Sequence, residues 1–132
     1  MSEASRRLDA SAIRAGAMTD LAILVPVVAL YAVLRGAGVL GSDTGIVVTA
    51  VVAVLIAPAA GGFTAGRRQM RAPLTNGAAA AGIAVLAYVA FRIVDASLRG
   101  STIHPGTILV LVTLSVTLGL LGGYVGFRSA RP

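Results

Sequence analysis

Three ionisable residues lie inside or at the ends of long apolar segments, where charged side chains are unusual. Asp20 is near the start of the first segment, and Arg92 and Asp95 are three positions apart near the end of the third. An ionisable group within a membrane is a candidate functional site, and helical residues three apart share a face. Asp20, Arg92 and Asp95 are therefore candidates for an intramembrane ion pair or a proton or cation relay. The preferred interpretation is an interfacial structural role, because near helix ends charged groups reach water.

The composition favours a bilayer over water as the surroundings of most of the chain. Of the 132 residues, 57% are hydrophobic and 12% are charged, and the mean hydropathy is +0.90. Soluble domains have roughly 25% charged residues, so this chain has too little polar surface to face water. Four apolar segments are each close to the ~20 residues that cross a ~30 Å hydrocarbon layer. The predicted helices cover about residues 17–34, 45–66, 77–95 and 105–127.

Short connections and an internal repeat predict how these helices are arranged. The segment Gly61–Arg67 resembles Gly122–Arg128, and the same offset of 61 relates Gly16 to Gly77. Short connections make neighbouring helices antiparallel. The sequence therefore predicts an all-α integral membrane four-helix bundle, built from two tandem helical hairpins with approximate two-fold symmetry. Residues 1–16 are expected to form a cytoplasmic N-terminal segment, and residues 17–132 the transmembrane domain.

The distribution of arginine predicts the orientation in the membrane. All 11 basic residues are arginine, and they lie in clusters between the apolar segments. Positively charged loops stay in the cytoplasm, so we expect the protein in the cell inner membrane with both termini cytoplasmic. These arginine-rich loops account for the net charge of +6, so we do not infer binding to nucleic acid. Eight arginines would then be cytoplasmic and three external: Arg6, Arg7, Arg14, Arg67, Arg68, Arg71, Arg128 and Arg131 against Arg35, Arg92 and Arg99.

Glycines spaced four apart are concentrated near the ends of the second and fourth predicted helices. Small residues at this spacing lie on one helix face and let two backbones approach closely. The preferred interpretation is packing inside the bundle, and the alternative is a docking surface for a second copy or another membrane protein. The predicted helix-packing residues are Gly61, Gly62, Gly66, Gly119, Gly122, Gly123 and Gly126.

The loop between the second and third predicted helices contains the densest basic cluster, formed by Arg67, Arg68 and Arg71. We interpret this cluster mainly as an orientation signal. The alternative is contact with anionic lipid or an acidic partner, because each basic residue near an anionic surface contributes about 1 kcal/mol.

Residues for catalysis or for transition-metal binding are scarce. The chain has no cysteine and a single histidine, His104, which we expect to be exposed in a loop. No nucleophile elbow, phosphate-binding loop, dinucleotide fingerprint or zinc-ligand spacing is present. We therefore expect no catalytic residue, no metal and no cofactor. Thr113, Ser115 and Thr117 are expected to bond to helix carbonyls or to another helix rather than to line a pore.

The segment Gly61–Arg67, followed by a basic loop and by Asn76-Gly77-Ala78, resembles a pattern in small uncharacterised bacterial four-helix membrane proteins. In that group a Gly-Gly-x-x-Ala-Gly-Arg turn closes the second helix and an Asn-Gly or Asp-Gly pair opens the third. The resemblance supports the four-helix topology and implies no activity. The end of the fourth helix departs from the pattern, because Gly126-Phe127-Arg128 replaces Ala-Gly-Arg.

These features predict a small non-catalytic membrane protein, a scaffold or an accessory subunit that packs through its Gly-rich helix faces. Its expected partners are the lipid bilayer and either further copies of itself or a larger membrane protein. One alternative is a small proton- or cation-coupled transporter, similar in size to the four-helix multidrug exporters. It ranks second because Asp20, the carboxylate of the first helix, is expected close to the membrane rim. A holin-like pore is a further alternative.

Overall fold

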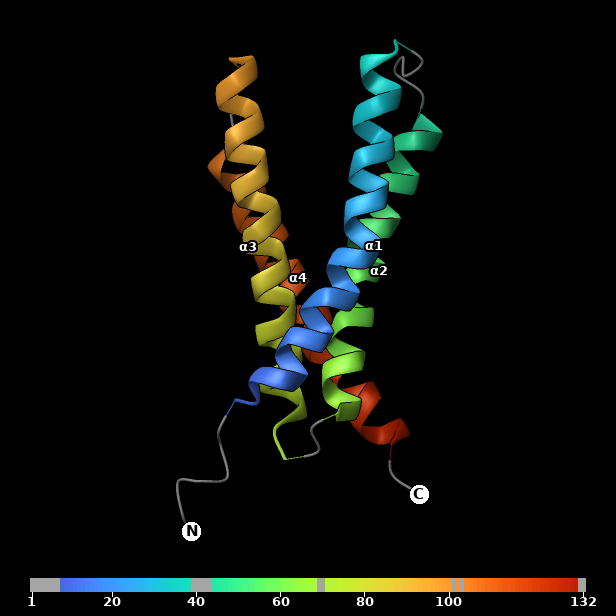
Figure 1. Cartoon of the computed structure of the whole chain (residues 1–132), viewed down its shortest axis with the longest axis vertical. Helices are drawn as coiled ribbons and strands as arrows, with labels where there is room; N and C mark the ends of the chain where they lie inside the picture. Colours follow the sequence, from blue (N-terminus) through green and yellow to red (C-terminus); the bar gives the residue numbers. More distant parts are fainter. Residues whose placement is uncertain (1–7, 39–43, 69–70, 101, 103, 131–132) are drawn as a thin grey trace.

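The computed structural model describes residues 8–38, 44–68, 71–100, 102 and 104–130. The described chain forms four helices, α1 (Ala10–Gly36), α2 (Thr44–Arg68), α3 (Pro73–Arg99) and α4 (Pro105–Ser129) (Figure 1). The predicted all-α four-helix bundle is therefore confirmed. The predictions for Arg6, Arg7 and Arg131, and for the side chains of Arg35 and Arg99, concern positions outside the described part of the structure.

Over the described residues, three helices, α1, α3 and α4, are long and apolar enough to cross a membrane. Large apolar side chains project outward from them, among them Leu30, Leu86 and Leu109, each at least 60% exposed. Such a surface suits lipid tails, which accept apolar side chains without the cost they incur in water. Several side chains of α2 lie outside the described part, so its membrane crossing stays a prediction.

Two helices begin earlier than the sequence analysis predicts. The helix α1 begins at Ala10 rather than at residue 17, and α3 begins at Pro73 rather than at residue 77. Asp9 caps α1, because its Oδ1 atom accepts hydrogen bonds from the backbone N–H groups of Ser11 and Ala12 at 2.8 and 3.1 Å. Proline suits the first turn of a helix, where its missing N–H has no partner to lose. The helices α1 and α3 therefore extend beyond the predicted transmembrane segments at their N-terminal ends.

The core of the bundle consists of small side chains. Ala57, Ala65, Ala80 and Ala81 are completely buried, together with a set of glycines, and the largest fully buried side chains are polar. Small residues allow helix backbones to touch, so van der Waals contact between backbones replaces the interlocking of large side chains. The helices are therefore closest where glycine and alanine are concentrated.

The bundle is narrow at one end and open at the other. The start of α1, the end of α4 and the α2–α3 connection lie at the narrow end, and the α1–α2 and α3–α4 hairpins diverge toward the other end (Figure 1). In the described part, α2 contacts α3, whereas α1 and α4 do not approach each other. The two hairpins run in the same direction, as predicted, but the expected two-fold symmetry is broken by this difference.

Candidate functional site

A layer of glycines joins α2 to α4. A Cβ atom added to Gly62 or Gly66 would overlap the backbone of Gly119 or Gly123. The contact is reciprocal, because a Cβ atom added to Gly122 or Gly126 would overlap the backbone of Ala59 or Phe63. Backbone cannot move aside as a flexible side chain can, so these positions require glycine.

Each hairpin also has its own glycine contact. A Cβ atom added to Gly61 would lie 2.7 Å from the carbonyl oxygen of Gly16, and one added to Gly119 would lie 2.7 Å from that of Gly77. Together with the α2–α4 layer, these contacts place all seven predicted helix-packing glycines against other helices of the same chain, and all seven are buried. The Gly-rich faces are thus covered internally.

Asp20 lies in the core of the bundle. Because α1 begins at Ala10, Asp20 is about 15 Å along the helix, at a rise of about 1.5 Å per residue. Its exposed fraction is 1%, and its Oδ2 atom has no hydrogen-bond partner among the described residues. Asp20 is thus shielded from its surroundings by the other helices, and its predicted interfacial position stays a prediction. A buried carboxyl without a partner is costly, so its presence calls for an explanation beyond packing.

The second hairpin shows that packing alone does not require a carboxyl at this position. A Cβ atom added to Gly61 would lie 2.9 Å from the Cβ atom of Asp20, and one added to Gly119 would lie 2.5 Å from the Cβ atom of Ala81. Asp20 and Ala81 therefore occupy equivalent places in the two hairpins. Since alanine fills this place in the second hairpin, the carboxyl of Asp20 is an addition that the glycine contact does not need.

Asp20 lines a small pocket between the two hairpins. The pocket has a free volume of about 10 Å³, close to the roughly 10–15 Å³ needed for one water molecule. Every helix contributes two lining residues, and along each helix they lie on the side of the glycine contacts that faces the open end. The lining residues are Asp20, Leu24, Val54, Pro58, Val85, Tyr88, Leu111 and Ser115.

Pro58 interrupts the backbone hydrogen bonds of α2 beside this pocket. Proline has no backbone N–H, so the helical hydrogen bond that the carbonyl of Val54 would accept from residue 58 cannot form. Both Val54 and Pro58 line the pocket. Three other lining residues, Asp20, Ser115 and Tyr88, have carboxyl or hydroxyl groups.

The hydroxyl groups of α4 differ in their surroundings. Thr113 and Thr117 are exposed and donate hydrogen bonds to the carbonyl oxygens of Leu109 and Thr113 at 2.8 and 2.7 Å. These two behave as predicted. Ser115 is 4% exposed and belongs to the wall of the small pocket, so it differs from its two neighbours in being buried between helices.

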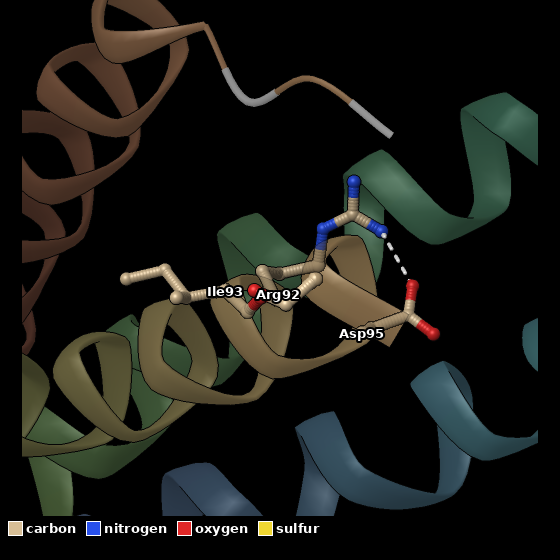
Figure 2. Close-up of polar contacts among 4 residues, drawn as sticks. Arg92, Ile93 and Asp95 are labelled. Atoms are coloured by element: carbon tan, nitrogen blue, oxygen red, sulfur yellow. Dashed lines mark hydrogen bonds and ion pairs between the residues drawn. The ribbon is translucent and has the colours of Figure 1, made fainter. Parts of the chain in front are cut away.

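Arg92 and Asp95 form the predicted pair on α3. The Nη1 atom of Arg92 lies 3.8 Å from the Oδ2 atom of Asp95, and their side chains are 49% and 24% exposed (Figure 2). Neither residue lines the Asp20 pocket, although Tyr88 lies one helical turn before Arg92 on the same face. The structure thus brings Arg92 and Asp95 together and leaves Asp20 in a separate place.

The basic cluster lies at the narrow end of the bundle. Arg67, Arg68 and Arg71 are exposed there, and the guanidinium of Arg67 is 5.6 Å from the centre of the Phe63 ring. This distance is within the range of a cation–π interaction. The role of this cluster as an orientation signal stays a prediction.

Asn76 is a buried polar residue that the sequence analysis treated only as part of a helix start. Its side chain is completely buried, and its Oδ1 atom accepts a hydrogen bond of 3.1 Å from the backbone N–H of Asp9. Its Nδ2 atom has no partner within the described ranges. Asn76 therefore holds the capped start of α1 against the first turn of α3. Asp9 could have been recognised as a helix cap from its place before an apolar segment.

Comparison with known proteins adds no relative: no family model, no curated protein and no solved structure matches this chain. The resemblance in the Gly61–Arg67 region therefore stays a prediction. Within the described ranges, no group of three or more histidine, cysteine, aspartate or glutamate side chains could hold a metal ion. His104 is exposed before α4.

Proposed function

We propose that this chain is a small non-catalytic membrane transporter that couples its transport to a proton or another cation bound at Asp20. The observation that carries this proposal is the burial of Asp20 between the hairpins, with one carboxyl oxygen that lacks a hydrogen-bond partner in the described structure. A buried unpaired carboxylate costs several kcal/mol. Binding a positive charge removes that cost, and releasing the charge restores it, so the site can exchange cations.

The position of the pocket supports the same function. Its lining residues follow the glycine contacts on each helix, toward the open end of the bundle. Many transporters have tandem repeats that move against each other around a central site. In the described part, the hairpins contact each other through α2 with α4, α2 with α3 and α1 with α3, whereas α1 and α4 have no such contact. A rocking motion about the α2–α4 contact would expose Asp20 to each side in turn.

This proposal reverses the order of the hypotheses drawn from the sequence. Transport ranked second because Asp20 was expected at the rim, and the burial of Asp20 among the four helices now favours it. A scaffold that binds partners through Gly-rich faces has less support, because those faces pack against helices of the same chain. We further propose an inner-membrane location with the narrow, arginine-rich end in the cytoplasm.

The test is proton movement in vesicles that contain the purified protein and a trapped pH-sensitive dye. We expect an imposed gradient of sodium, potassium or a lipophilic organic cation to change the internal pH through the wild-type protein. The Asp20→Asn variant should abolish this change while remaining helical by circular dichroism. Thr113→Ala is the matched control, because Thr113 is exposed and bonds to its own helix. Equal pH changes with the wild-type protein and Asp20→Asn would refute the proposal.

A further inference from the structure

We infer that the cation exchanged at Asp20 is a proton, and that loss of this proton separates the two hairpins at the open end of the bundle. This inference rests on the proposed function, because it names the ion that Asp20 binds and the movement that follows its release. The closed pocket described above is then the protonated form, in which the buried carboxyl group of Asp20 is neutral.

The lining of the pocket favours a proton over a metal ion. Five of the eight lining residues have apolar side chains, and Asp20 supplies the single carboxyl group. A bare metal cation needs several oxygens in place of its hydration shell, and this lining does not supply them. A proton needs none, because it forms a covalent bond to one carboxylate oxygen. The result is a neutral group, which is the form that a carboxyl group takes in apolar surroundings.

No charged group in the pocket can replace the proton. Tyr88 on α3 is the other titratable lining residue, and a phenol carries no positive charge. Leu24 is the second lining residue of α1, and the lining residues of α2 and α4 are uncharged. Arg92 and Asp95 follow Tyr88 on α3, but they pair with each other and do not line the pocket. An ionised Asp20 would therefore have no counter-charge in the closed pocket.

The closed pocket is also too small for an ionised carboxylate with its water. Its free volume of about 10 Å³ accepts about one water molecule. A carboxylate has about four lone-pair sites for hydrogen bonds, so one water molecule leaves most of them unsatisfied. Loss of the proton therefore requires the walls of the pocket to move apart and admit more water.

The glycine contacts determine which walls can move. Gly62 and Gly66 meet the backbone of Gly119 and Gly123 on the side of the pocket toward the narrow end. Toward the other end the hairpins diverge (Figure 1), and α1 has no contact with α4 in the described part. An ionised Asp20 thus opens the pocket toward the open end, and reprotonation closes it.

The first experiment measures the protonation of Asp20 in the full-length protein in detergent micelles. Infrared spectra at about pH 5 and about pH 9, which bracket the titration of most buried carboxyl groups, detect a neutral carboxyl group by its C=O stretch. The chain has five acidic residues, so a band that Asp20→Asn removes can be assigned. We expect this band at acid pH and its loss at alkaline pH.

Sodium chloride in place of choline chloride, at equal ionic strength, should leave the band of Asp20 unchanged. Absence of the band at acid pH, or its loss when sodium is added at constant pH, would overturn the assignment of the proton.

The second experiment measures the distance between the hairpins with pairs of spin labels. The chain has no cysteine, so Leu30→Cys combined with Leu109→Cys directs the labels to α1 and α4, at exposed positions. We expect their mean distance to be several ångströms longer at alkaline pH than at acid pH. In Asp20→Asn, which is neutral at both pH values, the distance should stay at the acid value. Asp20→Ala should give the same result, because Ala81 shows that alanine fits the equivalent position.

The matched control is the pair Leu98→Cys and Leu109→Cys, which labels the second hairpin alone at two exposed positions. Its distance should be the same at both pH values. A constant distance between α1 and α4, or a shift that persists in both Asp20 variants, would overturn the proposed movement.

These measurements separate the inference from the proposed function. Opening that depends on Asp20, without cation-driven proton movement in vesicles, would refute the coupled transport and leave the proton site. Proton movement that depends on Asp20, in a protein whose hairpins keep one distance, would overturn the opening and leave the transport function.

Discussion

The Cβ atom of Asp20 lies directly over Gly61, so that a Cβ atom built on Gly61 would come within 2.9 Å of it. The same added atom would lie 2.7 Å from the carbonyl oxygen of Gly16. Gly61 thus holds α1 and α2 together at the level of the buried carboxyl. The position of Asp20 between the hairpins depends on the missing side chain at Gly61.

We predict that Gly61→Ala disrupts the Asp20 site. The added methyl group must push α1 away, so the free energy of unfolding should fall by about 1–3 kcal/mol, as for other overpacked sites. Cation-driven proton movement should decrease, because Asp20 moves with α1. Unfolding in micelles and flux in vesicles would measure the two effects. Wild-type stability and flux in a protein with Gly61→Ala would contradict this prediction.

Gly66→Ala should destabilise the bundle more strongly than a glycine substitution away from the contact layer. Its Cβ atom would overlap the backbone of Gly123, whereas a Cβ atom added to Gly82 meets no atom within 4 Å. We expect Gly66→Ala to lower the free energy of unfolding by at least about 1–3 kcal/mol. Gly82→Ala should raise it by roughly 0.5–1 kcal/mol, because alanine favours the helix. Unfolding in micelles, followed by circular dichroism, compares the two variants, and equal stabilities would contradict the packing described here.

Asp20→Ala is predicted to make the protein more stable while it loses function. The substitution removes a buried oxygen that has no partner in the described structure, and Ala81 shows that alanine fits the equivalent position. Removing such a buried oxygen without a partner stabilises the folded state by about 1–3 kcal/mol. The free energy of unfolding in sodium-free micelles should therefore rise. A fall of similar size would show that the carboxyl stabilises the fold.

The cap of α1 gives a prediction about the start of the transmembrane region. Asp9→Ala removes the acceptor for the N–H groups of Ser11 and Ala12, which should cost about 0.5–2 kcal/mol. Asp9→Asn keeps an acceptor oxygen and should retain most of the stability. Hydrogen exchange at the first turn of α1 would measure both variants. Protection that is identical in the wild-type protein and Asp9→Ala would exclude the cap.

The arginine cluster gives a prediction about orientation. Replacing Arg67, Arg68 and Arg71 with glutamine removes the central cytoplasmic signal, so a fraction of the molecules should insert with inverted topology. Reporter tags at the two termini, scored for access from each side of the membrane, would measure that fraction. Replacing Arg92 with glutamine is the control and should strengthen the original orientation. Tags that report opposite sides in the wild-type protein would contradict the predicted topology.

The amino-acid sequence by itself determined the four helices and the arrangement of the two hairpins, and it indicated the glycine contacts. A long apolar segment in lipid must satisfy its own backbone hydrogen bonds, so it forms a helix. Because these bonds lie within the segment, the helix can be predicted from the sequence alone. Glycines four apart, such as Gly62 and Gly66, likewise lie on one face of any helix. The pairing of Arg92 with Asp95 follows from the same local geometry.

Only the tertiary structure decided which side chains meet between helices. The burial of Asp20 depends on Gly61, which lets α2 pack closely against α1. Each of the four helices contributes two residues to the pocket. Contacts between residues of different helices produce no periodic pattern in the sequence, so these residues could not be grouped in advance. Asn76 and Ser115 joined the interior for the same reason: burial depends on where a neighbouring helix lies, and composition does not determine that.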